Sequence, residues 1–342
     1  MKKALSILLA MTLILTLAIG CLAEAEPADG KGIVIGTLSL LKITEEQYLA
    51  RLKGKRIGME YLEEQGFYVS EKDSSTRPEL TGVIFYDRMS DMIMALQAGD
   101  ITSAEVPESM ADYLCAQNEK IVKRGEYLLE NMDDPTKRIA YRLGVGYAFL
   151  TKEDKTELRD EIDQAITAMK EDGTLDQLIR TYITDAASDP EPVEFTKVDG
   201  ETIRVAITGD LPPMDFVAPD GTPAGFNTAL LAELGRRLNK NFELIQVDSA
   251  GRSLALSEGK VDLVFWTSGN DGRSPGGRQT TEEHEVFRAE RNTPENQARY
   301  ELMQSLRGGL DYETLKNMDM PDGTIITQPY YNDMLVAIGI KK

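Results

Sequence analysis

Short apolar runs alternate with helical stripes in the first half of the chain. The stretch VIFYDRMSDMIMALQAGDITSAEV predicts a strand around Val83–Tyr86, a helix that ends at Gly99, and a short strand to Val106. Four apolar residues of this helix share one face: Met89, Met92, Ile93 and Leu96. Elements in this order predict parallel strands joined by right-handed helical crossovers.

A second group of elements follows between residues 145 and 179. An apolar strand is predicted over Val145–Leu150. The next helix carries five apolar residues in register: Leu158, Ile162, Ala165, Ile166 and Met169. Gly173 ends that helix, and another helix runs through Leu175, Leu178 and Ile179. These stripes predict packing in a core. Upstream, a helix is expected from Thr44 to Gln65, although residues 52–59 could instead form a turn and a strand.

A polar linker separates these elements from the rest of the chain. Between Tyr182 and Glu201 the stretch ITDAASDPEPVEFTKVDG has two prolines, several acids and no amphipathic period. Strands and helices then alternate again: strand Ile203–Ile207, helix Thr228–Leu238, strand Phe242–Val247, a helix ending at Gly259, and strand Val261–Trp266. Residues 267–323 are polar, and a last strand is predicted at Met334–Ile340.

The first residues predict the compartment. Lys2 and Lys3 precede an apolar run that is too short for a membrane span, so residues 1–20 are expected to be a secretory signal peptide. The order LAIGC approximates a lipoprotein cleavage box, which would acylate Cys21 and anchor the protein to the cell membrane. Cleavage after Ala25 remains open, and it would release a secreted or periplasmic protein. In both cases only Cys115 remains, so no disulfide is expected.

Composition narrows the function classes. A formal net charge of −19 in 342 residues repels nucleic acid and favours an acidic, solvated surface. His284 is the only histidine, so no Ser/His/Asp set and no histidine metal cluster can be assembled. A phosphate-binding glycine loop is also missing from the sequence. We therefore expect neither catalysis nor a metal or cofactor, and the length allows two domains or lobes.

One segment of the second half resembles a known family. Residues 203–266 are similar to the first lobe of the family 3 extracellular solute-binding proteins, the amino-acid receptors of bacterial ABC importers. The resemblance rests on a strand followed by G-D-x-P-P-x-D-F, a D-G-x-x-x-G-F turn, and a helix–strand–helix unit ending in G-K-V-D-L. It implies an α/β fold of the two-lobed type II periplasmic-binding-protein kind, with parallel-dominated sheets flanked by helices.

Other family elements occur once each, but in rotated order. TQPYYNDMLVAI resembles the first hinge strand, ALQAGDITSAEVPESMADYL the second lobe, GVGYAFLTKEDKTELRDEI the second hinge strand, and MKEDGTLDQLIRTYI the closing helices. This order implies a circular permutation. The expected parts are the second lobe and hinge strand (30–150), closing helices of the first lobe (151–185), a linker (186–200), and the first lobe with a polar insertion and terminal hinge strand (201–342). Two tandem, partly degenerate domains are the alternative.

Candidate ligand-binding residues of the first lobe lie at strand ends, where a two-lobed receptor meets its ligand. The loop after Ile207 carries four of them: Asp210, Met214, Asp215 and Phe216. In the family an aromatic residue of this loop commonly covers the ligand's side chain, a role for Phe216 or Met214, although Phe216 could pack within the lobe. Trp266, the only tryptophan, could stack on a ligand or pack in the core.

The family's carboxylate site is altered. Thr267 and Ser268 occupy the place where the family offers hydroxyl and backbone groups to a ligand carboxylate. The family's arginine in I-T-x-E-R, whose fork holds the carboxylate, is missing, and Arg273 and Arg278 are the nearest replacements.

The second lobe also departs from the family. Pro107 stands where the family supplies an acid for the ligand's ammonium, and Glu105 on the same face of the strand could replace it. Thr37 and Ser39 resemble the strand and G-T turn that offer backbone donors.

The resemblance implies a monomeric extracytoplasmic lipoprotein that delivers a small solute, an amino acid or similar carboxylate, to the permease of an ABC importer. The missing arginine and acid leave open a surface-anchored protein that kept the fold without ligand transport. An enzyme is a third alternative, since some members of the wider fold are dehydratases.

The lipid anchor can be tested at its cysteine. If Cys21 is acylated, the wild-type protein should partition with membranes, whereas Cys21→Ala should become soluble or stay unprocessed. Membrane fractionation and mass spectrometry of the mature N-terminus measure both. A mature N-terminus at Glu26 would contradict the lipoprotein hypothesis.

Overall fold

The computed structural model describes residues 33–38, 67–68, 80–124, 128–131, 138–140, 144–185, 192–218, 220–269 and 321–341. Several predicted features lie outside these residues: the signal peptide with Cys21, the helix Thr44–Gln65 and most of the polar stretch 267–323. None of the helices in the described ranges combines the length and the apolar character that a membrane span needs.

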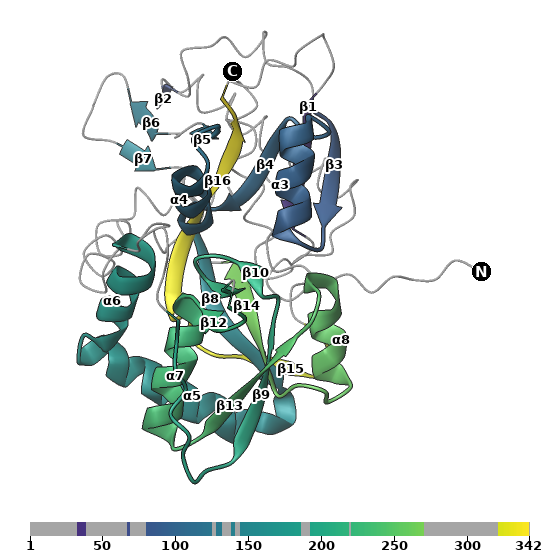
Figure 1. The fold of residues 1–342 in the computed structure, drawn as a ribbon. Helices are drawn as coiled ribbons and strands as arrows, with labels where there is room; N and C mark the ends of the chain where they lie inside the picture. The colour runs from purple at the N-terminus through teal and green to yellow at the C-terminus, as the bar shows by residue number, and fades with distance from the viewer. Residues whose placement is uncertain are drawn as a thin grey trace.

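The described strands form two lobes on one twisted sheet (Figure 1). Lobe one, at the bottom of Figure 1, holds β8 (Gly144–Lys152), β9 (Thr202–Ile207), β13 (Asn241–Gln246), β14 (Leu263–Gly269) and β15 (Thr324–Ile326). Lobe two, at the top, holds β1 (Ile33–Leu38), β3 (Leu80–Tyr86), β4 (Ser103–Pro107) and β5 (Ile121–Arg124). β16 (Tyr331–Ile340) passes through both lobes.

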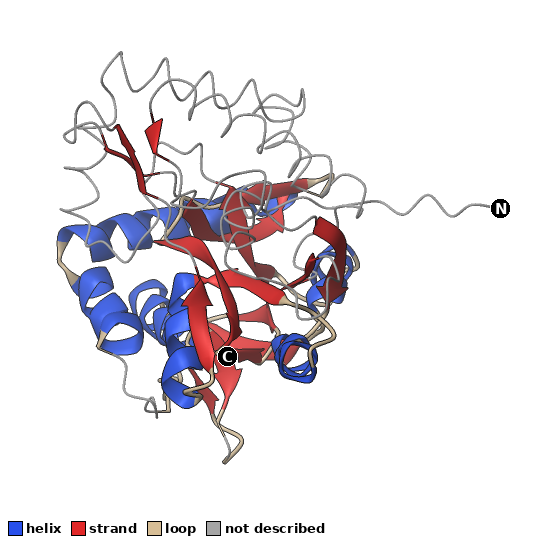
Figure 2. Ribbon diagram, turned by 90° about the horizontal axis from the view of Figure 1, so that it is seen from above, coloured by secondary structure: helices blue, strands red, loops and turns tan. Residues whose placement is uncertain are grey.

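Helices flank the sheets, as Figure 2 shows. Lobe two has α3 (Met89–Ala98) and α4 (Glu108–Gln117). Lobe one has α5 (Thr156–Glu171), α6 (Thr174–Ile179) with a π-helical continuation over Arg180–Thr184, α7 (Phe226–Leu238) and α8 (Arg252–Ser257). Two small sheets add β10 (Asp210–Leu211), β11 (Asp215–Val217) and β12 (Pro223–Ala224), and β2 (Phe67–Tyr68), β6 (Leu128–Asn131) and β7 (Arg138–Ala140). The predicted mixed α/β class is confirmed.

The predicted stripes lie in the core. All five apolar residues expected in α5 are buried. In α3, Met89, Met92 and Leu96 are buried, and Gly99 ends the helix at φ 81°, a left-handed conformation that glycine adopts without steric cost. Burial of these faces supplies the apolar area that holds each helix on its sheet.

Strand pairing follows the predicted crossovers. β1 pairs in parallel with β3 and β4, and β9 pairs in parallel with β13 and β14. β8 and β16 instead run antiparallel to their neighbours, and they are the strands that join the lobes. The lobes thus share two continuous backbone connections.

Several boundaries differ from the prediction. β16 begins at Tyr331 rather than Met334, because Tyr331 pairs with Tyr147 of β8. α7 begins at Phe226 rather than Thr228, since the N–H of Phe226 donates to the Pro213 carbonyl. Part of the expected linker, residues 192–200, lies against lobe one: the Val193 N–H donates to the Pro223 carbonyl at 3.1 Å.

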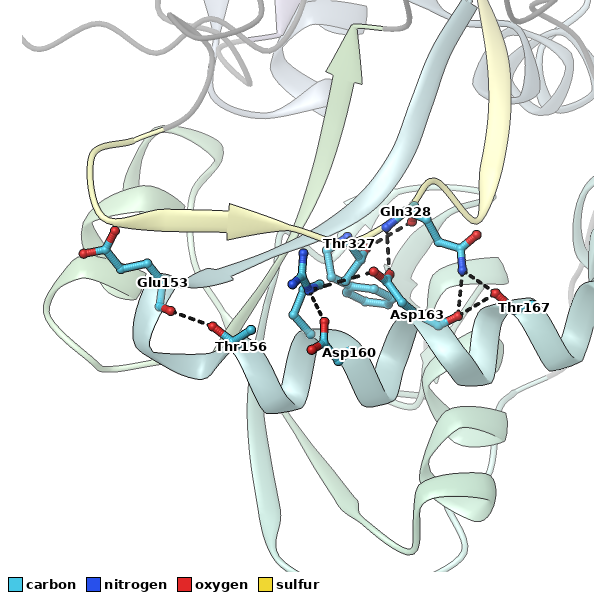
Figure 3. A network of polar contacts seen from close by, with 9 residues as sticks. Glu153, Thr156, Asp160, Asp163, Thr167, Thr327 and Gln328 are labelled. Carbon is cyan, nitrogen blue, oxygen red and sulfur yellow. Dashed lines mark hydrogen bonds and ion pairs between the residues drawn. The ribbon is translucent and has the colours of Figure 1, made fainter.

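Chain segments far apart in sequence meet in lobe one. Figure 3 shows the contact between α5 and the segment that precedes β16. The Gln328 N–H donates to Asp163 Oδ1 at 2.7 Å, and its side-chain amide donates to Thr167 Oγ1 at 2.7 Å. The Phe149 N–H donates to Thr327 Oγ1 at 2.9 Å. The closing helix is therefore fastened to the same lobe as β9, as a permuted chain requires; the permutation itself stays a prediction.

The arrangement allows a reordered chain to be designed. Ile338 of β16, Ala104 of β4 and Gly36 of β1 are neighbours across lobe two. Two strand spacings, about 10 Å, therefore separate the end of β16 from the start of β1. Residues 341, 342 and 30–32 can span about 17 Å when extended.

We expect residues 192–342 followed directly by residues 30–185 to fold with a single unfolding transition close to that of the parent chain. Circular dichroism during urea denaturation measures this. A control chain opened between Leu230 and Leu231 should not fold, because the break cuts buried α7. Independent melting of residues 30–185 and 192–342, expressed alone, would support tandem domains instead.

Candidate functional site

A small cavity lies beside the crossing of the two hinge strands. Its lining combines Met110 of lobe two, Tyr147 of β8, and seven residues of lobe one: Leu211, Met214, Asp215, Asn227, Arg252, Phe265 and Trp266. The space open to the centre of a water molecule is about 20 Å³, which is room for about one water. Pockets for small ligands usually measure hundreds of Å³. In this conformation the cavity is therefore too small for a solute.

The loop of lobe one depends on two glycines of the D-G-x-x-x-G-F turn. Gly221 and Gly225 have φ values of 87° and 101°, a region that favours glycine. A Cβ at Gly225 would also lie 2.5 Å from the Met214 carbonyl oxygen. The close approach lets the Asn227 N–H donate to that carbonyl at 2.8 Å. The motif thus positions Met214 and Asn227 at the cavity.

Asp215 organises this loop from inside. Its Oδ1 accepts hydrogen bonds from the Thr208 and Gly209 N–H groups at 3.2 and 3.3 Å, and from the Thr208 hydroxyl at 3.1 Å. Its Oδ2 accepts from Asn227 Nδ2 at 3.1 Å, and Tyr330 Oη donates to Asn227 Oδ1 at 2.9 Å. Burial raises the pKa of Asp215 above its ordinary value, although Arg252 and these donors oppose the shift. Because its oxygens already accept four hydrogen bonds, Asp215 shapes the site.

Asp210 joins the lobes at the start of α3. Arg88, the residue before this helix, has no side-chain capping bond of its own. Asp210 Oδ2 lies 3.5 Å from the hydroxyl of Ser90 and 3.8 Å from Arg88 Nε. Burial raises the pKa of Asp210, opposed by the Ser90 and Met89 backbone groups and by the Arg88 charge. A carboxylate here complements the positive end of the helix dipole, so Asp210 serves as a cap supplied by the opposite lobe.

A second contact between lobes occurs at the start of α4. Asp333 of β16 is fully buried and accepts from the Ser109 hydroxyl at 2.5 Å and the Ser109 N–H at 3.2 Å. The Ser109 hydroxyl also lies 3.9 Å from Met214 Sδ in lobe one. A buried carboxylate of the hinge strand thus occupies the N-terminus of a lobe-two helix.

Two aromatic candidates occupy different places. Phe216 is half-buried, and its ring centroid lies 6.3 Å from that of Tyr113 on α4, so it contacts lobe two rather than packing only within lobe one. Trp266 is 3% exposed and lines the cavity. Its Nε1 has no hydrogen-bond partner among the described residues. Trp266 therefore packs in the core and also contacts the cavity, and its stacking on a ligand stays a prediction.

Two of the remaining candidates, Glu105 and Thr37, are not brought to the cavity. Glu105 and Thr37 are each 1% exposed, lie within strands β4 and β1, and are not among its lining residues. Thr267 and Ser268 continue β14 and pair with Tyr147 and Gly146 through the backbone. Ser39, Arg273 and Arg278 lie outside the described residues.

Arg252, which the sequence analysis did not select, lines the cavity. It is 5% exposed, on α8, and its Nη1 donates to the Phe265 carbonyl at 2.9 Å. Burial lowers the pKa of the guanidinium to about 10, against the opposing charge of Asp215. A signal was present, because Arg252 lies three and four residues before Ala255 and Leu256, which are buried on the same helix.

Comparison with known proteins agrees with part of the sequence prediction. Residues 203–273 match the profile of the bacterial extracellular solute-binding proteins, family 3. That match includes Arg252 and most of the cavity lining, but only part of the chain. No curated protein matches the sequence.

Solved structures share a weak likeness over most of the chain. The ligand-binding component of an ABC-type import system from Staphylococcus aureus, with zinc bound, has a TM-score of 0.38 and 12% identity over 91% of this chain and 66% of its own. The binding protein AgaA from A. tumefacien R10, in complex with agropinic acid, has a TM-score of 0.34 and 13% identity; the match covers 81% of this chain and 61% of AgaA. A periplasmic substrate-binding protein of an ABC transporter from Coxiella burnetii has a TM-score of 0.32 and 10% identity; the match covers 86% of this chain and 100% of that protein.

The chain spans less than two thirds of the length of the first two structures. Scores below 0.5 support no argument by themselves, so the assignment of the cavity rests on its own geometry and on the family match.

Asp215, which is buried, and Asp262, which is partly exposed, should respond to pH in opposite directions. The folded-state pKa of Asp215 is raised from 3.8, so its contribution to the free energy of unfolding falls as the pH rises above about 4. Burial alone would raise the pKa of Asp262. The hydrogen bonds and charge of Arg204 outweigh this effect, so the folded-state pKa is lowered. Its contribution is present above about pH 4 and is lost as the pH falls below that value.

Urea denaturation of Asp215→Asn and Asp262→Asn from pH 3 to 7 measures both effects. Relative to wild type, Asp215→Asn should gain stability as the pH rises, and Asp262→Asn should lose it. Parallel pH profiles for the two variants would contradict this assignment.

Proposed function

We propose that this protein is a solute-binding receptor that closes its two lobes on a small solute, an amino acid or similar carboxylate, and delivers it to an ABC importer. The observation that carries the proposal is the cavity at the hinge crossing, whose mainly apolar lining includes Asp215, Asn227 and Arg252 and to which both lobes contribute side chains. The family match over residues 203–273, which includes most of that lining, supports it. In this proposal the receptor is monomeric, acts outside the cytoplasm, and is anchored by a lipid on Cys21.

The contacts between the lobes suit reversible closure. Among the described residues, the lobes are joined by polar contacts of Asp210 with the start of α3 and of Ser109 with Asp333, and by a ring contact of Phe216 with Tyr113. Bending at the hinge strands β8 and β16 would break such contacts without disrupting either core. A solute that touches both lobes would then favour the closed state, because it binds that state better than the open one.

A surface-anchored protein without ligand transport is the second candidate. It is favoured by the size of the cavity, about 20 Å³, and by the four hydrogen bonds that already occupy Asp215. In this alternative the closed state is permanent, and the polar groups only hold the lobes together.

Ligand screening separates the two candidates. Thermal shift and calorimetry across amino acids, short peptides and organic acids should identify a solute that stabilises the receptor by about 2.7 kcal/mol at a hundredfold excess over Kd. Trp266→Ala should weaken binding, because its indole lines the cavity.

Phe195→Ala is the matched control, since Phe195 is partly buried against the core but does not line the cavity. Its effect on binding should be negligible. Absence of heat and of any melting shift across the panel would rule out the receptor and leave the second candidate.

A further inference from the structure

Three buried polar groups of lobe one lack hydrogen-bond partners among the described residues. They are Arg252 Nε on α8, Trp266 Nε1 on β14 and Tyr147 Oη on the hinge strand β8. The three residues are 5%, 3% and 4% exposed, and all of them line the cavity at the hinge crossing. Buried polar groups are nearly always paired in folded proteins, so the cavity is the place where a partner can reach these three.

The size of the cavity limits what this partner can be. About 20 Å³ of it is open to the centre of a water molecule. A polar site needs about 10–15 Å³ on this measure to hold one water. A carboxylate or an amino acid has several heavy atoms, so it does not fit unless the lining rearranges. In this conformation the cavity therefore accepts a partner with a single heavy atom.

The hydrogen-bonding chemistry of the three groups selects water. The guanidinium of Arg252 and the indole of Trp266 can only donate, and a water oxygen accepts from both. The hydroxyl of Tyr147 also accepts, so the same water can donate to it. Buried waters typically make about three hydrogen bonds, which these three groups supply. Two N–H donors beside a guanidinium charge disfavour a cation.

Oxygen atoms of the protein around the cavity are already engaged. The carboxylate of Asp215 accepts four hydrogen bonds. Asn227 Oδ1 accepts from Tyr330 Oη. The Phe265 carbonyl accepts from Arg252 at Nη1, which is a different nitrogen from the unpartnered Nε. These oxygens therefore stabilise the lining, and the three open groups face a separate partner.

We infer that the cavity is the binding site of one ordered water molecule, which accepts from Arg252 Nε and Trp266 Nε1 and donates to Tyr147 Oη. Because the three groups come from three elements, this water joins α8 and β14 to the hinge strand β8. It adds a second polar link to the one that Arg252 makes directly with the Phe265 carbonyl. The inference concerns the protein alone and does not depend on the proposed function.

Crystallography tests the site directly. Crystals of the purified protein are grown without added solute, once in sodium chloride and once in sodium bromide. We expect one isolated density peak about 2.7–3.2 Å from Arg252 Nε, Trp266 Nε1 and Tyr147 Oη, with no anomalous signal in bromide. An anomalous peak would identify a halide ion instead of water. Either that peak or a cavity without density overturns the inference.

The single tryptophan of the chain allows a second test in solution, because the indole N–H of Trp266 gives one NMR signal. A rotating-frame Overhauser cross-peak between this proton and water reports a bound water. Tyr147→Phe removes the hydroxyl, which could relay such a signal, and leaves both N–H donors. We expect the cross-peak to persist in this variant at reduced intensity, since the water keeps two of its three partners.

Tyr86→Phe is the matched control, because Tyr86 packs against the core without lining the cavity. Its cross-peak should equal that of wild type. Complete loss of the cross-peak in Tyr147→Phe, or equal loss in both variants, overturns the water site. Failure of the water site leaves the receptor proposal standing, and failure of the ligand screen leaves the water site standing.

Discussion

The pairing of β16 with strands of both lobes is the constraint on which the rest of the molecule depends. Its first residues, Tyr331–Met334, pair with β8 in lobe one, and Leu335–Ile338 pair with β4 in lobe two. Buried aromatic rings pack around this crossing: Tyr147, Phe149, Phe226, Phe265, Tyr330 and Tyr331, with neighbouring centroids 5.0–6.5 Å apart. Such rings bury large apolar areas and prefer tilted geometries. This crossing therefore sets where the two lobes can meet.

Several polar groups are buried in this apolar surrounding. Their hydrogen bonds must offset the desolvation free energy that burial costs. Asp215, Asn227 and Tyr330 form one chain of hydrogen bonds, and Ser109 and Asp333 form another. The first chain connects Tyr330, just before β16, to α7 and β11, and the second connects β16 to the start of α4. The open donors of Arg252, Trp266 and Tyr147 lie among these satisfied groups.

The local pattern of apolar residues was sufficient to predict the helices and strands. It was insufficient to predict the contacts between them. The stripes of α3 and α5 follow from apolar residues at helical spacing, and Gly99 and Gly173 end these helices as predicted. The cap that Asp210 supplies to α3 joins residues 120 positions apart, so no local pattern contains it. The sequence analysis did not select Arg252, whose burial depends on how α8 packs against β8 and β14.

β16 lies C-terminal to every other described strand, and this position affects how the protein can be made. A ribosome completes the strands on both sides of β16 before β16 itself exists. Until then β8 and β4 each present an unpaired edge in the middle of what will become one sheet, and such edges invite association between chains. Contacts such as Ser103 with Ile338, 235 residues apart, close only after β16 has been made. The sheet that joins the lobes can therefore form only after β16, the last of the described strands, has been made. Until then the exposed edges of β4 and β8 must stay unpaired.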